Sequence, residues 1–282
     1  MSSPIPVRPF APDSAPPGPA APAEPSLVPA VERAARIVDH LAGQRRPQPL
    51  ADLAKALALP KSSLHGLLHT LAALGLASRN ERGEYALGSK PLQWAAAFVQ
   101  QSGVIEAFNA AADRLATLHE ETIMLAVLDG ADVLYLACRP GTRALGVTFR
   151  VGGRFPASCT SSGKAMLATL SEARVRRLLG DGPLPTLTPH SLPDVAALLS
   201  QLETFRASGY ALDDEETAEG MHCFGAPVFA AGQPEAVAAV AVSLIKASTS
   251  PERYAEVVTA VRALAAAVSQ QLGGRPAPDA AQ

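Results

Sequence analysis

The chain has 282 residues, of which 48% are hydrophobic, and a formal net charge of −2. This composition favours a soluble protein of about two domains, and no run reaches the roughly 18 apolar residues that a membrane span needs. The three cysteines, Cys138, Cys159 and Cys223, are odd in number and widely spaced, which argues against a disulfide framework and fits a reducing cytoplasm.

The two ends of the chain are expected to be disordered tails, at residues 1–26 and 275–282. Pro, Ala and Ser dominate the first of these, and almost nothing in it can be buried. No apolar segment follows Arg8, so no signal peptide is expected.

A first helix is predicted from Ser26 to about Ala42, with Pro29 tolerated in its first turn. Its apolar residues recur at helical spacing and would pack under the next two helices. The predicted inward face consists of Val31, Ala35, Val38 and Leu41.

Residues 50–76, LADLAKALALPKSSLHGLLHTLAALGL, predict two helices joined by a tight turn. Pro60 ends the first helix, because proline cannot continue the hydrogen-bond ladder. Ser62 or Ser63 is expected to cap the second helix and Gly75 to end it. The outward face of the second helix is polar or cationic and suits a polyanion's groove; it carries Lys61, Ser62, Ser63, His65, His69 and Thr70.

A hairpin is predicted directly after this helix, from Leu76 to Gly88, with Arg79 and Arg82 at its tip. Helix, turn, helix and basic hairpin in this order indicate a winged helix-turn-helix, whose second helix enters the major groove of DNA. Charge supports this interpretation, since residues 27–88 contain eight Lys/Arg and five Asp/Glu, a net charge of +3. The alternative is an ordinary pair of helices with a solvated polar face, because the pattern alone is only moderately specific.

Residues 89–102 are predicted to form a linker helix, capped by Ser89 and with Pro91 in its first turn. It carries Trp94, the only tryptophan, and Phe98. Trp94 is either an ordinary core residue or the anchor of a subunit interface, where aromatic residues are enriched.

Residues 103–274 change character and are predicted to form an α+β domain, in which an antiparallel sheet is flanked by helices. Asp129-Gly130 is expected to form a tight hairpin turn between the first two strands. Strands are predicted at 122–128, 133–137, 145–151, 210–213, 222–229 and 236–245; helices are predicted at 104–119, 161–170, 171–179, 194–208 and 251–272.

The loop FPASCTSSGK, residues 155–164, is rich in hydroxyls and opens a helix. Free amides and hydroxyls at a helix N-terminus bind small anions such as carboxylates, which makes Ser161 and Ser162 candidate ligands. Ser161-x-x-Lys164 matches an acylating-enzyme motif whose companions S-D-N and K-T-G are absent, and the loop fails the phosphate-binding pattern.

A second polar cluster, YALDDEETAEGMHC at residues 210–223, places several carboxylates near His222 and Cys223. A divalent metal site is conceivable, but calcium-loop spacing and a second histidine at i+4 are missing. An acidic turn with one carboxylate facing a pocket is the preferred interpretation. No catalytic arrangement, metal site or cofactor is therefore predicted, and the domain is expected to bind a ligand and not to act as an enzyme.

The chain resembles the IclR family of bacterial transcriptional regulators over about residues 27–274. The matching stretches are AVERAARIVDHLA, the helix-turn-helix segment with Tyr85–Gly88, FPASCTSSGKAMLA, and GYALDDEETAEGMHCFGAPVF followed by AAVAVS. The resemblance implies a winged helix-turn-helix domain at 27–88, the linker helix, and an effector domain at 103–274 that is similar to GAF and PAS folds.

By the same resemblance, the chain would act as a homodimer or a dimer of dimers on a palindromic double-stranded DNA operator and would respond to a small organic or aromatic acid. The DNA contacts would come from Lys61, Ser62, Ser63, His65, His69, Arg79 and Arg82. The effector pocket would be lined by Phe155, Ser161, Ser162, Gly163, Asp213, Met221, Cys223, Ala241 and Ser243.

The sequence departs from the family pattern at two of these places. Gly66 stands where the family usually has an arginine, so the phosphate or base contact of that arginine does not carry over. Ala241 lacks the hydroxyl that some members have. A small-molecule or metal-dependent enzyme, whose winged domain serves only assembly, is the alternative function.

Overall fold

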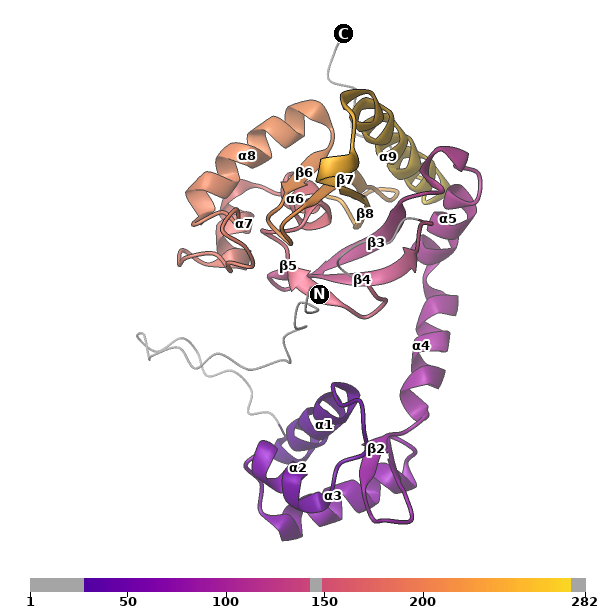
Figure 1. The fold of residues 1–282 in the computed structure, drawn as a ribbon, viewed down its shortest axis with the longest axis vertical. Coiled ribbons are helices and arrows are strands. Elements are labelled where there is room, and N and C mark those ends of the chain that lie inside the picture. Colours follow the sequence, from indigo (N-terminus) through magenta and orange to yellow (C-terminus); the bar gives the residue numbers. More distant parts are fainter. Residues whose placement is uncertain (1–27, 143–148, 275–282) are drawn as a thin grey trace. The chain divides into compact units, whose positions relative to one another are not determined.

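The computed structural model describes residues 28–142 and 149–274, so both predicted tails lie outside the described residues. The chain divides between Gln101 and Ser102 into two compact units (Figure 1).

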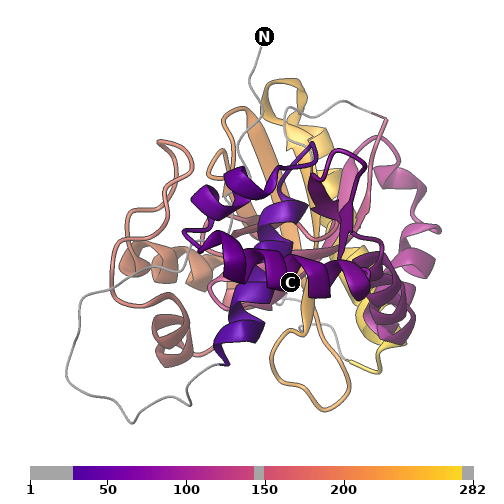
Figure 2. The ribbon, with the colours of Figure 1, turned by 90° about the horizontal axis from the view of Figure 1, so that it is seen from below.

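The N-terminal unit is a small helical bundle with one hairpin (Figure 2). Its buried core is formed mainly by leucines, together with Ile37 from the first helix and Tyr85 from the hairpin. The predicted order of helix, turn, helix and hairpin is confirmed. The elements are α1 (Pro29–Ala42), α2 (Leu50–Ala56), α3 (Lys61–Ala73), β1 (Ala77–Arg79), β2 (Tyr85–Leu87) and α4 (Lys90–Gln101).

The inward face predicted for α1 is wrong, because the buried side of the helix is rotated by part of a turn from it. Val31 is 67% exposed, whereas Ile37 is fully buried. The buried stripe follows Ala34, Ile37 and Leu41, with Val38 partly buried. The predicted and the observed stripes both have helical spacing, and both contain Val38 and Leu41. The sequence pattern alone therefore could not decide which stripe is buried.

The ends of α3 differ in part from the prediction. Pro60 occupies the N-cap position, and no side chain caps the helix, so the expected cap by Ser62 or Ser63 is wrong. Proline suits this position because the first helical residues have no intrahelical acceptor for their N–H groups. Gly75 has a φ of 73° just beyond the C-terminus, which confirms that this glycine ends the helix.

The C-terminal unit is built on one antiparallel six-stranded sheet of order β5-β4-β3-β8-β7-β6. The predicted α+β class is thereby confirmed. Its elements are α5 (Gly103–Ala112), β3 (Thr122–Asp129), β4 (Asp132–Arg139), β5 (Arg154–Pro156), α6 (Ser161–Leu167), α7 (Glu172–Leu179), α8 (Val195–Ser208), β6 (Ala211–Asp214), β7 (Met221–Val228), β8 (Ala238–Ile245) and α9 (Pro251–Gln271).

Helices cover both faces of this sheet (Figure 1). α5 and α9 share one hydrophobic core with the sheet, while α6, α7 and α8 share a second core on the opposite face. Every residue of β8 except Ile245 is buried, which explains why this strand reads as a continuous apolar run and does not alternate.

Two segments depart from the expected boundaries. The helix predicted over 104–119 ends at Ala112 and is followed by a short 3₁₀ turn at Ala116–Leu118. Of the strand predicted over 145–151, residues 145–148 lie outside the described residues and residues 149–151 are not a strand. The strand that pairs with β4 is instead β5, which the sequence analysis missed because it has only three residues.

Two glycines allow α6 to lie unusually close to the sheet. A Cβ atom at Gly225 of β7 would stand 2.4 Å from the carbonyl oxygen of Ser161, and one at Gly163 of α6 would stand 2.2 Å from that of Ala157. Any larger residue at either position would push the helix away. The serines that begin α6 are therefore held directly over the sheet.

Candidate functional site

The polar face of α3 is presented to solvent. Leu64, Leu68 and Leu71 point into the core of the N-terminal unit. The predicted DNA-contacting side chains of this helix are all exposed: Lys61, Ser62, Ser63, His65 and His69. Gly66 lies on the same open side, and a Cβ atom there would meet no other atom within 4 Å.

The hairpin after α3 holds the two predicted wing arginines in different ways. The guanidinium of Arg79 lies over the ring of Tyr85, 5.6 Å from its centroid, whereas Arg82 is exposed in the turn. The Asn80 side chain fixes this turn by accepting from the Glu84 amide at 2.9 Å and donating to the Glu84 carboxylate at 2.8 Å.

A third strand-like segment extends the wing and was missed by the sequence analysis. Gln48 and Tyr85 exchange backbone hydrogen bonds of 2.7 and 2.8 Å. A single residue pair leaves no periodicity in the sequence, so no pattern predicted it.

In the C-terminal unit, the predicted effector residues come together on the sheet face that α6 covers. Asp213, Cys223 and Ser243 are direct neighbours across β6, β7 and β8. The Sγ atom of Cys223 lies 3.1 Å from the hydroxyl of Ser243. The predicted residues on this face are almost wholly buried, namely Ser161, Ser162, Asp213, Met221, Cys223, Ala241 and Ser243.

The buried hydroxyl of Ser162 has incomplete hydrogen bonding. Ser162 is fully buried, and its hydroxyl forms no well-aligned hydrogen bond with any residue in the described ranges. The hydroxyl of Tyr135 lies beside it. Burial raises the pKa of Tyr135, so this hydroxyl stays protonated and remains a donor at neutral pH.

Three aromatic rings gather next to this pair of hydroxyls. The ring centroid of Tyr135 is 5.5 Å from that of Phe149 and 5.8 Å from that of Phe155. Only Phe155 was predicted. Tyr135 could have been found from the alternation of its strand, which places it on the same face as Val133, whereas Phe149 is in irregular chain and gave no signal.

Asp213 is already engaged by the protein. Its Oδ1 atom accepts hydrogen bonds from the backbone amides of Glu216, at 2.8 Å, and Thr217, at 3.1 Å. Burial nevertheless raises the pKa of this carboxyl, because desolvation outweighs the hydrogen bonds. Asp213 therefore shapes the loop between β6 and β7.

A buried ion pair lies behind the serines. Lys164 of α6 contacts the carboxylate of Glu216, and its Nζ atom also donates to the carbonyl oxygen of Leu212, at 2.8 Å, and to Gln201 Oε1, at 3.2 Å. Burial raises the pKa of Glu216 to about 7, with Lys164 opposing the shift. The sequence analysis considered Lys164 only as part of an acylating-enzyme motif and of a phosphate-binding loop, and it rejected both.

Two further carboxylates of the acidic turn, those of Asp214 and Glu215, face a surface lysine. Lys246 Nζ lies 2.6 Å from oxygens of both Asp214 and Glu215, and His222 Nε2 is 2.9 Å from Asp214. Within residues 28–142 and 149–274, no group of three His, Cys, Asp or Glu side chains is arranged to hold a metal ion.

Family models match most of the chain. The IclR helix-turn-helix domain matches residues 30–81, and the bacterial transcriptional regulator IclR C-terminal domain matches residues 96–270. The chain belongs to the IclR family of bacterial transcriptional regulators.

Known IclR proteins align over nearly their whole length. The HTH-type transcriptional regulator XynR of Escherichia coli K12 is 31% identical over 88% of this chain and 98% of its own. The crystal structure of the Agobacterium tumefaciens repressor BlcR is 37% identical with a TM-score of 0.58, covering 88% of this chain and 98% of its own. An IclR homologue from Microbacterium hydrocarbonoxydans, complexed with 4-hydroxybenzoate, shares the fold with a TM-score of 0.73 at 24% identity, over 86% and 99% of the two chains.

The IclR assignment makes the chain a DNA-binding transcriptional regulator with an N-terminal winged helix-turn-helix and a C-terminal effector domain. None of the helices in the described part of the chain is long and apolar enough to cross a membrane.

Proposed function

We propose that this IclR regulator senses a small organic or aromatic acid in the buried cluster around Ser162, and that binding changes its affinity for an operator. The observation that carries this proposal is the Ser162 hydroxyl, which is fully buried and lacks a well-aligned partner among the described residues. An unsatisfied buried polar group costs about 1–3 kcal/mol, and a ligand oxygen would remove this penalty.

The surroundings of Ser162 match an acid with a small apolar body. Ser162 and Tyr135 supply hydroxyl donors for a carboxylate, while Phe155, Met221 and Cys223 supply apolar contact. The two backbone amides that donate to Asp213 offset part of its charge, which reduces its repulsion of an acid. The complex of the Microbacterium homologue makes hydroxybenzoates the first compounds to test.

On DNA, α3 would enter the major groove and the wing would contact the backbone. The exposed residues that would make these contacts are Lys61, Ser62, Ser63, His65 and His69 on α3, and Arg79 and Arg82 on the wing. A two-fold dimer would require a palindromic operator with half-site centres about 10 base pairs apart, or a multiple of that spacing. An acid that binds one subunit arrangement more tightly than another would shift the population of DNA-binding dimers.

The effector proposal is tested by titrating hydroxybenzoates and short organic acids into the wild type and into a Ser161→Ala/Ser162→Ala variant, by calorimetry. The variant should bind the active acid more weakly while its operator affinity without acid is unchanged. Ser158→Ala, in the same loop, serves as the matched control and should behave as wild type. Equal affinity in the double variant would place the effector site elsewhere, and turnover of the acid would favour an enzyme.

The DNA contacts are tested through salt dependence. Arg82→Gln should weaken binding to all DNA sequences alike and reduce the slope of log affinity against log salt by roughly 1, as expected for one lost phosphate contact. Arg33→Gln, an exposed arginine on α1, is the matched control. An unchanged slope for Arg82→Gln would show that the wing does not touch the backbone. His65→Ala and His69→Ala should change sequence preference instead.

A further inference from the structure

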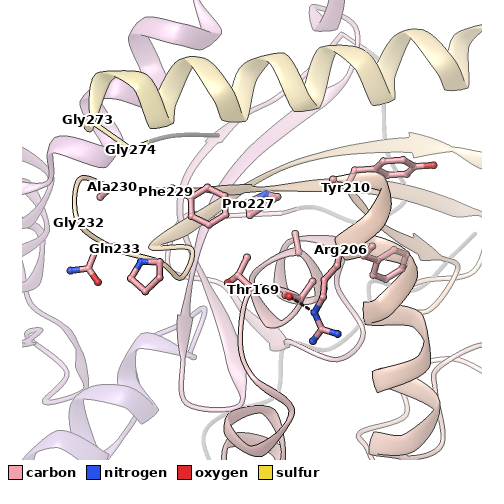
Figure 3. A pocket seen from close by; sticks show the side chains of 15 residues that line it. Thr169, Arg206, Tyr210, Pro227, Phe229, Ala230, Gly232, Gln233, Gly273 and Gly274 are labelled. Carbon is pink, nitrogen blue, oxygen red and sulfur yellow. Dashed lines mark hydrogen bonds between the residues drawn. The ribbon is translucent and has the colours of Figure 1, made fainter. Parts of the chain in front are cut away.

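A cavity of about 670 Å³ lies in the C-terminal unit (Figure 3). None of the residues that line it belongs to the proposed effector cluster. Its walls come from the later part of α6, the end of α8, the end of β7 with the loop that follows, and the chain after α9. Its size falls within the range of small-molecule sites.

The wall opposite α8 is fixed by the backbone. Ala230 and Gly273 form an isolated β-bridge, and the amide of Ala231 donates to the carbonyl of Leu272 at 3.0 Å. The amide of Phe229 donates to the Ser269 hydroxyl at 3.0 Å. A Cβ atom at Gly274 would stand 2.2 Å from the carbonyl oxygen of Phe229, so only glycine fits there. The cavity is therefore preformed and does not depend on a ligand to order this wall.

Among the residues that the structure describes, Arg206 is the one charged residue that lines the cavity. Its guanidinium donates to the carbonyl oxygens of Ala168, at 2.7 Å, and Leu170, at 3.3 Å, at the end of α6. Both acceptors are neutral, and no ion pair joins Arg206 to a carboxylate within the described ranges. Glu235, next to the lining residue Pro234, is paired with Arg174 at 2.7 Å. Arg206 thus keeps its full positive charge at the cavity.

The other described residues of the lining are uncharged. Phe205, Phe229, Pro227 and Pro234 supply apolar surface, and the hydroxyl of Thr169 is engaged by Met166 and Ala236. Tyr210 and Gln233 are the other polar residues of the lining.

We propose that this cavity is a second ligand site, which takes an amphipathic monoanion with an aromatic or branched apolar body and a single carboxylate or sulfonate. The apolar body would fill the space between Phe205 and Phe229, and the anionic group would bind the outer nitrogens of Arg206, since guanidinium groups pair with planar oxyanions. The site is independent of the effector proposal because it shares no residue with that cluster.

The test uses 1-naphthoate and its neutral analogue 1-naphthamide as probes in calorimetric titrations of the full chain. The wild type should bind naphthoate with one site that survives Ser161→Ala/Ser162→Ala. Ala230→Trp, which fills the cavity, should abolish this site, whereas Ala231→Trp, on the exposed neighbour outside the lining, should leave it intact. Survival of naphthoate binding in Ala230→Trp would overturn the proposal.

The charge is tested at Arg206. Arg206→Gln should weaken naphthoate roughly tenfold or more, as expected for the loss of a charge-assisted hydrogen bond, and naphthamide by much less. Arg206→Lys should recover part of the naphthoate affinity, which a purely structural role at the end of α6 would not produce. Equal weakening of both probes would overturn the role of the charge. Absence of naphthoate binding, with an oligomer size that changes in Ala230→Trp, would show that a second copy of the chain covers the cavity instead.

Discussion

At the scale of single residues, the ion pair between Lys164 and Glu216 is the most consequential contact outside the serine cluster. Both side chains are almost fully buried, at 0% and 4% exposure. Removing one partner leaves the other charge buried and uncompensated, whereas removing both leaves no buried charge. Comparing the single with the double substitution therefore distinguishes the net contribution of the ion pair to stability from the cost of leaving one charge unpaired.

Lys164→Met should lower the free energy of unfolding by about 3–5 kcal/mol, and Lys164→Met/Glu216→Leu should recover most of that loss. Urea unfolding of both variants measures the difference. Lys246→Met is the matched control, because its pairs with Asp214 and Glu215 lie at the surface, where solvent screens them and their effect on stability is small. A double variant as unstable as the single one would show that the lysine stem, and not the charge, is what the core needs.

Glu216 should also make stability depend on pH. Its pKa rises from 4.5 to about 7 on folding, so the folded protein binds the proton more tightly than the unfolded chain. Protonation of Glu216 therefore favours the folded state; its contribution to stability is complete below about pH 4.5 and is lost as the pH rises through about 7.

Unfolding free energies at pH 5 and pH 8 measure this effect, and the decline between them should be smaller in Glu216→Gln than in the wild type. Glu215 supplies the opposite case, because Lys246 lowers its pKa to about 2. Glu215→Gln should therefore change the pH dependence only below about pH 4.5. An identical decline of the unfolding free energy in the wild type and in Glu216→Gln would show that Glu216 does not cause the pH dependence.

At the scale of elements, Gly66 should lower the stability of α3. Glycine inside a helix is less favourable than alanine by about 1 kcal/mol, and a methyl group at Gly66 would meet nothing within 4 Å. Gly66→Ala should stabilise the N-terminal unit by about that amount in thermal unfolding. Gly75→Ala should destabilise it, because Gly75 has a positive φ. If Gly66→Ala weakened operator binding despite a more stable helix, DNA would approach the main chain at this position.

Sequence patterns predicted the helix-turn-helix and nearly every strand of the sheet, because long apolar runs with turn residues between them are unambiguous. They failed where an element is short or where two helical phases coexist, as for β5 and α1. For the candidate site, the sequence marked Ser161, Ser162 and the acidic turn. It did not mark Lys164 as the partner of Glu216, since residues 52 positions apart along the chain meet only through the fold.

At the scale of the whole molecule, α4 carries large apolar side chains on two of its sides that its own unit does not cover. Leu92 is 74% exposed, Trp94 and Phe98 are each 55% exposed, and Val99 is 43% exposed. No residue of α4 is buried. Exposed aromatic side chains mark interaction surfaces, and we expect a second copy of α4 to cover Trp94 and Phe98.

Trp94→Ala should therefore shift the chain towards monomer and remove cooperative operator binding, while the C-terminal unit stays folded. Sedimentation velocity over a range of concentrations, together with operator titrations, measures both effects. Gln100→Ala, an exposed polar position on the same helix, is the control. A native-sized oligomer with normal operator affinity would show that Trp94 is not an interface anchor.

The burial of β8 on both faces makes this protein prone to aggregate when its sheet opens. The sequence of β8, AAVAVSLI, is apolar, uncharged and free of proline, which is the signature of a segment that stacks into intermolecular β-structure when exposed. In the folded chain, β3 and β7 occupy both of its edges. Variants that open the sheet should therefore precipitate on heating and fail to refold, so their damage would be seen as loss of soluble protein before any loss of repression or activation.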